Sequence, residues 1–165
     1  MTQRLSPYHG AVQADWLDYN GHMNVAYYVM AFDHATDAVF DEWQIGADYC
    51  RDQQRSLFAV EQHTVYDREL TQGAGFEVVT YPVRLSPKTL HLIMAMRHRE
   101  AGFLVATQEH LFVHVDMVAR RAVPWSDTAY QGLQDHMAAY ERVKEADDLW
   151  QSVLVERLGR AILKK

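Results

Sequence analysis

Residues 25–43 read "VAYYVMAFDHATDAVFDEW", and their apolar side chains recur every three or four positions. This spacing predicts one long amphipathic helix, with acidic side chains such as Asp33 and Asp37 mostly on its polar side. Asn24 is suited to cap the first turn, and Gly46 lies just past the last one. Both predicted ends of the helix therefore have a local chemical reason.

The segments that follow this helix have the composition of β-strands. The longer ones cover residues 57–70, 76–85, 90–99 and 103–116, and shorter ones are predicted around 9–16 and at 121–123. The connections between the long strands are of hairpin length, which predicts a mainly antiparallel sheet. A second amphipathic helix is predicted at 128–144.

A sheet of this size must cover its apolar face, and the segment 25–43 is the only long helix that lies within the strand order. The expected architecture is therefore α+β. It is a hotdog fold, in which an antiparallel sheet of five or six strands wraps around a long central helix. Residues 1–165 are expected to form one domain of this type, with a helical extension from about residue 127.

Composition and charge exclude several classes of protein. The chain of 165 residues is 48% hydrophobic and 23% charged, which is typical of a soluble globular protein. A net charge of −6 argues against a nucleic-acid partner, and the single cysteine, Cys50, cannot form an intrachain disulfide. The longest apolar run, 25–32, is too short to cross a bilayer, and the N-terminus lacks a signal sequence. A cytoplasmic protein without membrane attachment is expected.

A cluster of polar residues precedes the central helix, in the stretch "DWLDYNGHMNVAYY" at 15–28. It places a carboxylate, an amide, a glycine and an imidazole within five positions. A helix N-terminus has unpaired backbone N–H groups and a partial positive charge, so it can stabilise the oxyanion that forms when a carbonyl is attacked. A carboxylate one turn upstream can serve as base or nucleophile. This stretch is therefore the candidate catalytic site.

The spacing of Asp18, Gly21 and Val25 resembles that in hotdog acyl-CoA thioesterases of the 4-hydroxybenzoyl-CoA thioesterase type, over roughly residues 8–125. The stretch "DYNGHMN" at 18–24 also resembles the D-x-N-x-H-x-N motif of the related acyl-carrier-protein thioesterases. The strings "WLDYNGHM" and "EHLFVHVD" are similar to the betainyl-CoA thioesterase branch.

The resemblance implies hydrolysis of an acyl-CoA thioester to a free acid and CoA. Asp18 would attack the carbonyl or activate water, and the Val25 N–H would hold the oxyanion, with Gly21 allowing close approach. Asn20 would orient Asp18 or the water, and His22 completes the implied catalytic group. No cofactor is implied, because CoA is part of the substrate. The resemblance also implies a homodimer whose sites take groups from both subunits, with a homotetramer, a dimer of dimers, left open.

The aromatic residues near the helix start are candidates for binding the acyl group. Tyr28 matches an aromatic position of the family, and Trp16 and Tyr27 lie close to it in sequence. Aromatic faces attract quaternary ammonium groups, so a small polar or cationic acyl group is predicted. Asn24 is a further binding candidate, although its position is more typical of a helix cap.

Other binding candidates lie on the strands. Glu61 and His63 share one strand face and are expected to reach the site from below or from a neighbouring subunit. Basic residues at adjacent strand ends are expected to cluster and to meet the CoA nucleotide; they are Arg84, Lys88, Arg97 and Arg99. For each of these four residues, a solvent-exposed charge at the end of a strand is the simpler interpretation.

Structural roles compete with these chemical ones. Asp18 stands beside an asparagine and a glycine, where an aspartate commonly stabilises a turn, and His22 can be a structural hydrogen bonder. His110 and His114 share a strand face, but no third ligand lies at a suitable spacing, so no metal site is predicted.

Two functions other than hydrolysis stay open. A hotdog enoyl-CoA hydratase would use an aspartate and a histidine five positions apart, but Asp18 and His22 are four apart, and Gly21 stands in place of the usual proline. A non-catalytic acyl-CoA-binding domain would keep the fold without needing Asp18 at all.

Overall fold

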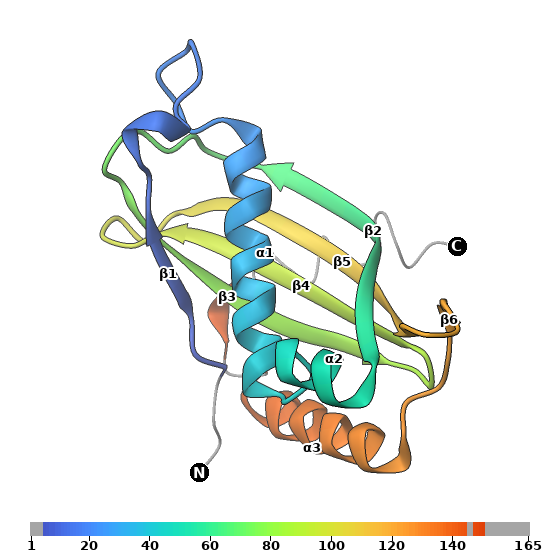
Figure 1. The fold of residues 1–165 in the computed structure, drawn as a ribbon. Coiled ribbons are helices and arrows are strands. Elements are labelled where there is room, and N and C mark those ends of the chain that lie inside the picture. Colours follow the sequence, from blue (N-terminus) through green and yellow to red (C-terminus); the bar gives the residue numbers. More distant parts are fainter. Residues whose placement is uncertain (1–4, 145–146, 151–165) are drawn as a thin grey trace.

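The computed structural model describes residues 5–144 and 147–150, and Figure 1 shows the arrangement of their helices and strands. The elements in chain order are β1 Tyr8–Ala11, the 3-10 helix η1 Ala14–Trp16, α1 Val25–Glu42, α2 Ala47–Gln53, β2 Arg55–Tyr66, β3 Gly75–Leu85, β4 Thr89–His98, β5 Leu104–Asp116, β6 Arg121–Ala122 and α3 Asp127–Lys144. The part of the predicted C-terminal extension beyond residue 150 lies outside the described residues.

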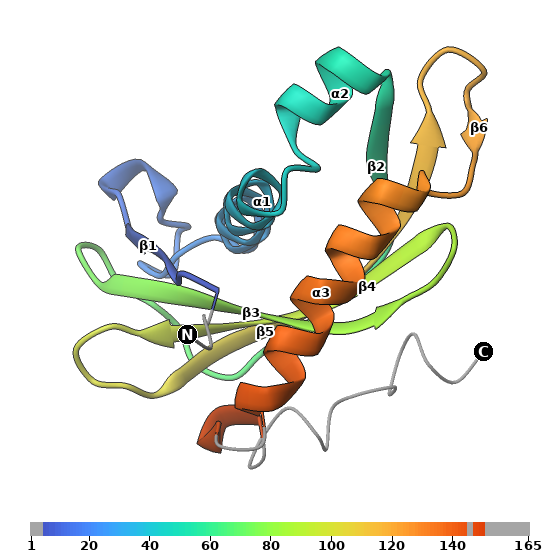
Figure 2. The ribbon, with the colours of Figure 1, turned by 90° about the horizontal axis from the view of Figure 1, so that it is seen from below.

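The strands form one antiparallel sheet in the order β1-β3-β4-β5-β2, with β6 paired to β5. Figures 1 and 2 show the sheet curling around α1, which lies along its concave face. Helix α3 passes the C-terminal end of α1 near its own middle, where the His136 ring stacks on Trp43. It ends against the opposite face of the sheet, where Tyr140 contacts Tyr81. The predicted α+β hotdog fold is confirmed.

The central helix begins where its capping residue predicts. The Asn24 side chain accepts a hydrogen bond from the Ala26 N–H at 3.0 Å, which satisfies one of the unpaired amides of the first turn. The inner face of α1 is buried against the sheet, and Phe32 and Ala35 are among its least exposed residues. The packing of this face, more than helix propensity, holds α1 in place.

The predicted role of Gly46 at the end of the central helix is wrong. The helix ends at Glu42 with Trp43 as its C-cap, and the chain reverses through Gln44, whose φ of 59° is left-handed. The Ile45 N–H then returns to the Phe40 carbonyl at 2.8 Å. Gly46 instead precedes α2, a helix of seven residues. The sequence did not predict this helix, because its segment is mostly polar and lacks an apolar stripe.

The predicted strands agree with the structure except where tertiary contacts redirect the chain. Strand β2 starts at Arg55 and ends at Tyr66, four residues before the predicted end at 70, because the next two amides both donate to the Val105 carbonyl. The predicted strand at 9–16 divides into β1 and η1. No helix of the described residues is long and apolar enough to cross a bilayer.

Strand β2 occupies one edge of the sheet, and β5 is its only partner among the described strands. Successive side chains of a strand point to opposite faces. Thr64 and Tyr66 face α1, because Thr64 binds Gln108 and the Tyr66 ring meets Tyr28 of the helix. His63 lies on the other face, and Glu61 lies on the same side as His63.

Candidate active site at the start of the central helix

The loop between η1 and α1 is tied by short-range backbone hydrogen bonds. The Asp18 N–H donates to the His22 carbonyl at 2.9 Å, and the Gly21 N–H donates back to the Asp18 carbonyl at 3.0 Å. Gly21 has a φ of +79°, a left-handed conformation that favours glycine. Nothing lies within 4 Å of a Cβ built there, so this subunit needs the glycine for the turn and not for close approach.

The half-buried Asp18 carboxylate is held by its own loop. Its Oδ1 accepts a hydrogen bond from the Asn20 N–H at 2.8 Å, and Oδ2 lies 3.4 Å from the Asn20 side-chain amide. This is an Asx turn, so the structural role considered for Asp18 is present. The same bonds orient the carboxylate as Asn20 was expected to do, and they leave further lone pairs of both oxygens open for chemistry.

The first backbone amide of α1 is open to an incoming group. No hydrogen bond among the described residues has the Val25 N–H as its donor, and Val25 is 60% exposed. The segment is anchored from behind, because Met23 N–H donates to the Leu70 carbonyl at 2.8 Å and Asn24 N–H donates to the Trp16 carbonyl at 2.9 Å. The helix dipole adds a partial positive charge at this point.

Two tyrosines border the helix start. Tyr28 is only 4% exposed, and its hydroxyl oxygen accepts a hydrogen bond from the Leu70 N–H at 3.1 Å. Burial raises the pKa of Tyr28, and the nearby Asp18 carboxylate raises it further, so this hydroxyl stays protonated. Tyr66 of β2 meets the Tyr28 ring edge-on at 5.3 Å between centroids. Sequence reasoning missed Tyr66, although its position at the end of a strand was a usable signal.

The three aromatic residues proposed to bind a cation pack on one core cluster but differ in burial. Trp16 and Tyr27 stack face to face at 5.2 Å, while the Tyr28 ring is buried in the core. The buried Tyr28 ring therefore offers no open face to a cation, whereas binding of the acyl group by Trp16 and Tyr27 stays a prediction. Asn24 acts as the helix cap.

Glu61 and His63 do not reach the helix start of their own subunit from below, so that alternative is wrong, and an approach from a neighbouring subunit stays a prediction. Both lie on the face of the sheet turned away from α1. His63 pairs across the strands with Glu109, which binds the buried His91 at 2.9 Å. Side chains alternate between the two faces along a strand, so the register of β2 turns Glu61 and His63 away from α1.

The predicted cluster of basic residues is also wrong. Lys88 lies in the turn between β3 and β4, near Arg84, at the end of the sheet away from the start of α1. Arg97 and Arg99 lie at the opposite end of β4, and Arg97 is 3.7 Å from the Glu77 carboxylate. The length of a ten-residue strand separates the two pairs.

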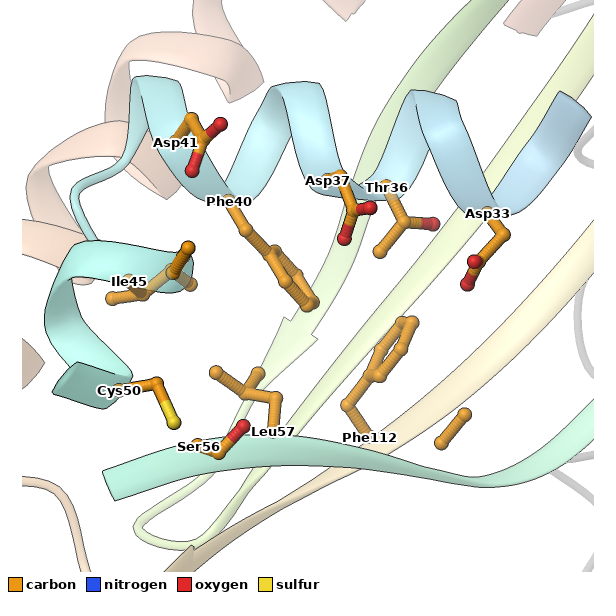
Figure 3. A pocket seen from close by; sticks show the side chains of 13 residues that line it. Asp33, Thr36, Asp37, Phe40, Asp41, Ile45, Cys50, Ser56, Leu57 and Phe112 are labelled. Carbon is orange, nitrogen blue, oxygen red and sulfur yellow. The ribbon is translucent and has the colours of Figure 1, made fainter. Parts of the chain in front are cut away.

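A cavity of about 350 Å³ lies between α1, α2 and β2. Figure 3 shows Asp33 and Asp37 projecting from α1 toward β2, with the rings of Phe40 and Phe112 beside them. Asp41 also lines it, and none of the thirteen described lining residues is basic. Burial and the neighbouring Asp33 and Asp41 charges raise the pKa of Asp37. The cavity therefore suits a cationic group with apolar surface.

His110 and His114 both face α1 but do not share a ligand. The His114 ring lies between the Tyr49 hydroxyl and the Val123 carbonyl, each at 2.9 Å. His110 is almost fully buried, and burial lowers its pKa to about 4. No group of three potential metal ligands occurs within the described ranges.

The low pKa of His110, about 4, predicts a loss of stability in mild acid. The unfolded chain binds a proton as the pH falls through about 6.5, whereas the folded protein does not until about 4, so stability is lost between these values. The full effect is about 3 kcal/mol in the free energy of unfolding. Urea unfolding of the wild type and of His110→Asn at several pH values measures it. Equal pH dependence of the two proteins would contradict the prediction.

The curled antiparallel sheet around one helix, with a carboxylate before the open helix amide, defines a hotdog protein with a candidate acyl-transfer site. Residues 12–138 match the thioesterase-like superfamily. The chain belongs to this superfamily, and it is a thioesterase.

Named relatives agree with this assignment. The chain is 32% identical over 125 residues to a betainyl-CoA thioesterase of Pseudomonas aeruginosa, covering 76% of this chain and 79% of the relative. It is 33% identical over 171 residues to an L-carnitine dehydrogenase/betainyl-CoA thioesterase of Agrobacterium fabrum, covering 96% of this chain but only 35% of that longer protein. A Staphylococcus aureus protein solved in complex with CoA has the same fold, with a TM-score of 0.78, 23% identity and coverage of 83% and 85%.

Proposed function

We propose that this thioesterase hydrolyses an acyl-CoA thioester to a free acid and CoA at the start of α1. The observation that carries the proposal is the Asp18 carboxylate, held by the Asn20 N–H at 2.8 Å, a few residues before the open N–H of Val25. Such a pairing supplies a base or nucleophile together with an oxyanion donor. The coenzyme A is a substrate, so no cofactor is needed.

The reaction proceeds by one of two routes. As a base, Asp18 takes a proton from water while the water oxygen attacks the thioester carbonyl. As a nucleophile, Asp18 attacks the carbonyl itself and forms an anhydride, which water then hydrolyses. In both routes the Val25 N–H and the helix dipole stabilise the oxyanion, the carbon–sulfur bond breaks, and the CoA thiolate takes up a proton.

We further propose that two subunits pair through the free edges of β2. This edge is twelve residues long, and Phe58 and Val60 on it are 42% and 56% exposed. A long unpaired strand with apolar side chains favours pairing with another strand. If two copies of β2 pair antiparallel about a two-fold axis, the Tyr66 end of one strand meets the Arg55 end of the other. The helix start of one subunit then faces the acidic cavity of its partner.

This pairing predicts a dimer in solution at micromolar concentration. Light scattering coupled to size-exclusion chromatography gives the mass directly, and twice the mass of one chain is the expected result. A mass of four chains would extend the proposal to a dimer of dimers. A stable monomer that retains full activity would contradict the shared site.

The acyl group is proposed to be small and cationic. The cavity beside β2 presents Asp33, Asp37 and Asp41 next to the rings of Phe40 and Phe112. Carboxylates and aromatic faces together stabilise a quaternary ammonium group. The names of the relatives, betainyl-CoA thioesterases, point to the same chemistry.

A thiol-release assay tests the function across short, branched, aromatic and quaternary-ammonium acyl-CoAs. Release of free CoA from the saturated substrates supports hydrolysis. Loss of enoyl absorbance without thiol release would support a hydratase, and binding without either reaction would support a non-catalytic acyl-CoA-binding domain.

A further inference from the structure

Helix α2 forms one wall of the acidic cavity, but few contacts attach it to the rest of the fold. Ala47 and Cys50 of this helix line the cavity, and Figure 3 shows the Cys50 side chain pointing from α2 toward β2. None of the seven residues of α2 is buried, and five of them are exposed. A segment with so few buried contacts opens locally at a lower free energy than the core. The position of this wall therefore depends on a small number of contacts.

Both ends of α2 have a backbone conformation that residues other than glycine rarely adopt. Gln44 before the helix and Gln54 at its C-cap have φ values of 59° and 52°, in the left-handed region. Hydrogen bonds anchor the chain at both points, because the Ile45 N–H donates to the Phe40 carbonyl at 2.8 Å and the Met117 N–H donates to the Gln54 carbonyl at 3.0 Å. A few residues at the ends of a segment absorb the backbone changes of a hinge. Gln44 and Gln54 are therefore suited to be the hinges of α2.

One side chain connects α2 to the sheet. The Tyr49 hydroxyl lies 2.9 Å from the His114 Nε2 of β5, and within the described residues this is the only side-chain hydrogen bond from α2 to another element. The ion pairs of Arg51 stay within the helix, because its partners are Asp48 and Asp52. The Tyr49 ring also packs against the apolar core. Tyr49 is thus the main connection between α2 and the sheet.

The hydrogen bond between Tyr49 and His114 has a defined direction. The His114 Nδ1 lies 2.9 Å from the Val123 carbonyl oxygen, which can only accept, so Nδ1 carries the proton. Burial lowers the pKa of His114, so its ring is neutral near neutral pH and its Nε2 accepts the proton of the Tyr49 hydroxyl. The His114 ring is itself held by stacking on Trp125, at 4.2 Å between centroids. A fixed acceptor in the sheet thus holds Tyr49 in one position.

We propose that α2 is a gate at one end of the acidic cavity and that Tyr49 is the positioning residue that holds it closed. When the bond from Tyr49 to His114 breaks, α2 turns about Gln44 and Gln54, and the cavity opens at the end that Cys50 lines. A cationic acyl group or its free acid enters or leaves through this end. The identity of that occupant rests on the proposed function, whereas the gate itself does not.

The only cysteine of the chain measures the opening directly, because Cys50 lines the cavity. Its alkylation is followed with N-ethylmaleimide, which is small, and with a maleimide that carries a bulky dye and reaches the thiol only when α2 moves. Tyr49→Phe should raise the rate with the bulky reagent about 3- to 10-fold, as for loss of one hydrogen bond, and the rate with N-ethylmaleimide much less. Equal rates with the bulky reagent in Tyr49→Phe and the wild type would overturn the proposal.

Tyr130→Phe on α3 is the matched control, because Tyr130 packs against the same core cluster as Tyr49. It should change neither rate. His114→Phe removes the acceptor, so the double variant with Tyr49→Phe should label no faster than His114→Phe alone. Additive effects of the two substitutions would mean that Tyr49 does not act through His114 and would contradict the proposal.

Mild urea separates a gate from general unfolding. Well below the unfolding midpoint, the rate with the bulky reagent should change little with urea, because a local opening exposes little surface. A steep rise over the same range would mean that Cys50 reacts only in the globally unfolded chain, and the gate would then be wrong.

Turnover keeps this inference apart from the proposed function. Tyr49→Phe should raise KM for a quaternary-ammonium acyl-CoA about 3- to 10-fold and leave kcat near the wild-type value, because α2 supplies a wall of the cavity and not a reacting group. If the wild type releases no CoA from any acyl-CoA of the panel, the proposed function fails, and the labelling of Cys50 still decides whether α2 is a gate. If the wild type releases CoA but Tyr49→Phe labels at the wild-type rate, only the gate fails.

Discussion

Asp18→Asn is expected to slow the chemical step of thioester hydrolysis by roughly 10²-fold or more while leaving the fold intact. Asparagine has nearly the same size, and its side-chain oxygen can still accept the hydrogen bond from the Asn20 N–H. It cannot take a proton from water or form an anhydride. The loss should therefore appear in kcat, measured by thiol release, and not in the affinity for an unreactive analogue.

Asp15→Asn is the matched control for this prediction, because Asp15 is an exposed aspartate of η1 in the same region of the chain. It should leave both turnover and binding near the wild-type level. The structure makes Asp18 the residue of an Asx turn, a role that asparagine fills almost equally well. Near-normal turnover in Asp18→Asn would therefore mean that Asp18 only stabilises the turn. His22 would then be the next candidate for the catalytic base.

The double substitution Asp33→Asn and Asp37→Asn is expected to lower kcat/KM for a quaternary-ammonium acyl-CoA by about 10- to 100-fold. Both carboxylates line the cavity that the proposed dimer places against the partner's helix start. Their removal weakens attraction for a cationic acyl group and leaves the apolar contacts of Phe40 and Phe112. Betainyl-CoA and tert-butylacetyl-CoA are the substrates to compare, because they have the same shape and differ in charge.

The neutral substrate provides the internal control, since its kcat/KM should change little in the double variant. Asp127→Asn at the start of α3 removes an exposed carboxylate elsewhere and should alter neither substrate. An equal loss for both substrates would mean that the two aspartates support the fold of the cavity instead of recognising charge. A wild-type preference for long-chain acyl-CoAs would contradict the cationic substrate class altogether.

The features that local chemistry controls were predictable from the sequence. The start of α1 follows from Asn24 as a cap, its buried face follows from helical spacing, and the hairpin connections follow from short turn signals. The candidate site could also be predicted from local chemistry, because Asp18, Gly21 and Val25 lie within eight positions of one another. These residues belong to one turn and the helix start that follows it. The residue that closes α1 was misjudged, since Gln44 and not Gly46 adopts the left-handed conformation.

Which distant side chains share a face of the sheet could not be read from the sequence, because strand pairing sets it. The strand alternation and the bulge near Ala59 turn Glu61 and His63 away from the helix, while Thr64 and Tyr66 face it. The separation of Arg84 and Arg97 likewise depends on the direction of β4.

The acidic cavity and the hydrogen bond between Gln108 and Thr64 unite residues that lie far apart in the chain. Thr64 and Gln108 are 44 positions apart, and they meet because β2 and β5 pair in one particular register. The helix and the candidate catalytic loop could be predicted from the sequence alone, since hydrogen bonds between near neighbours specify them. The register of the strands decided the rest, because a shift of a single residue would turn every one of these side chains to the other face of the sheet.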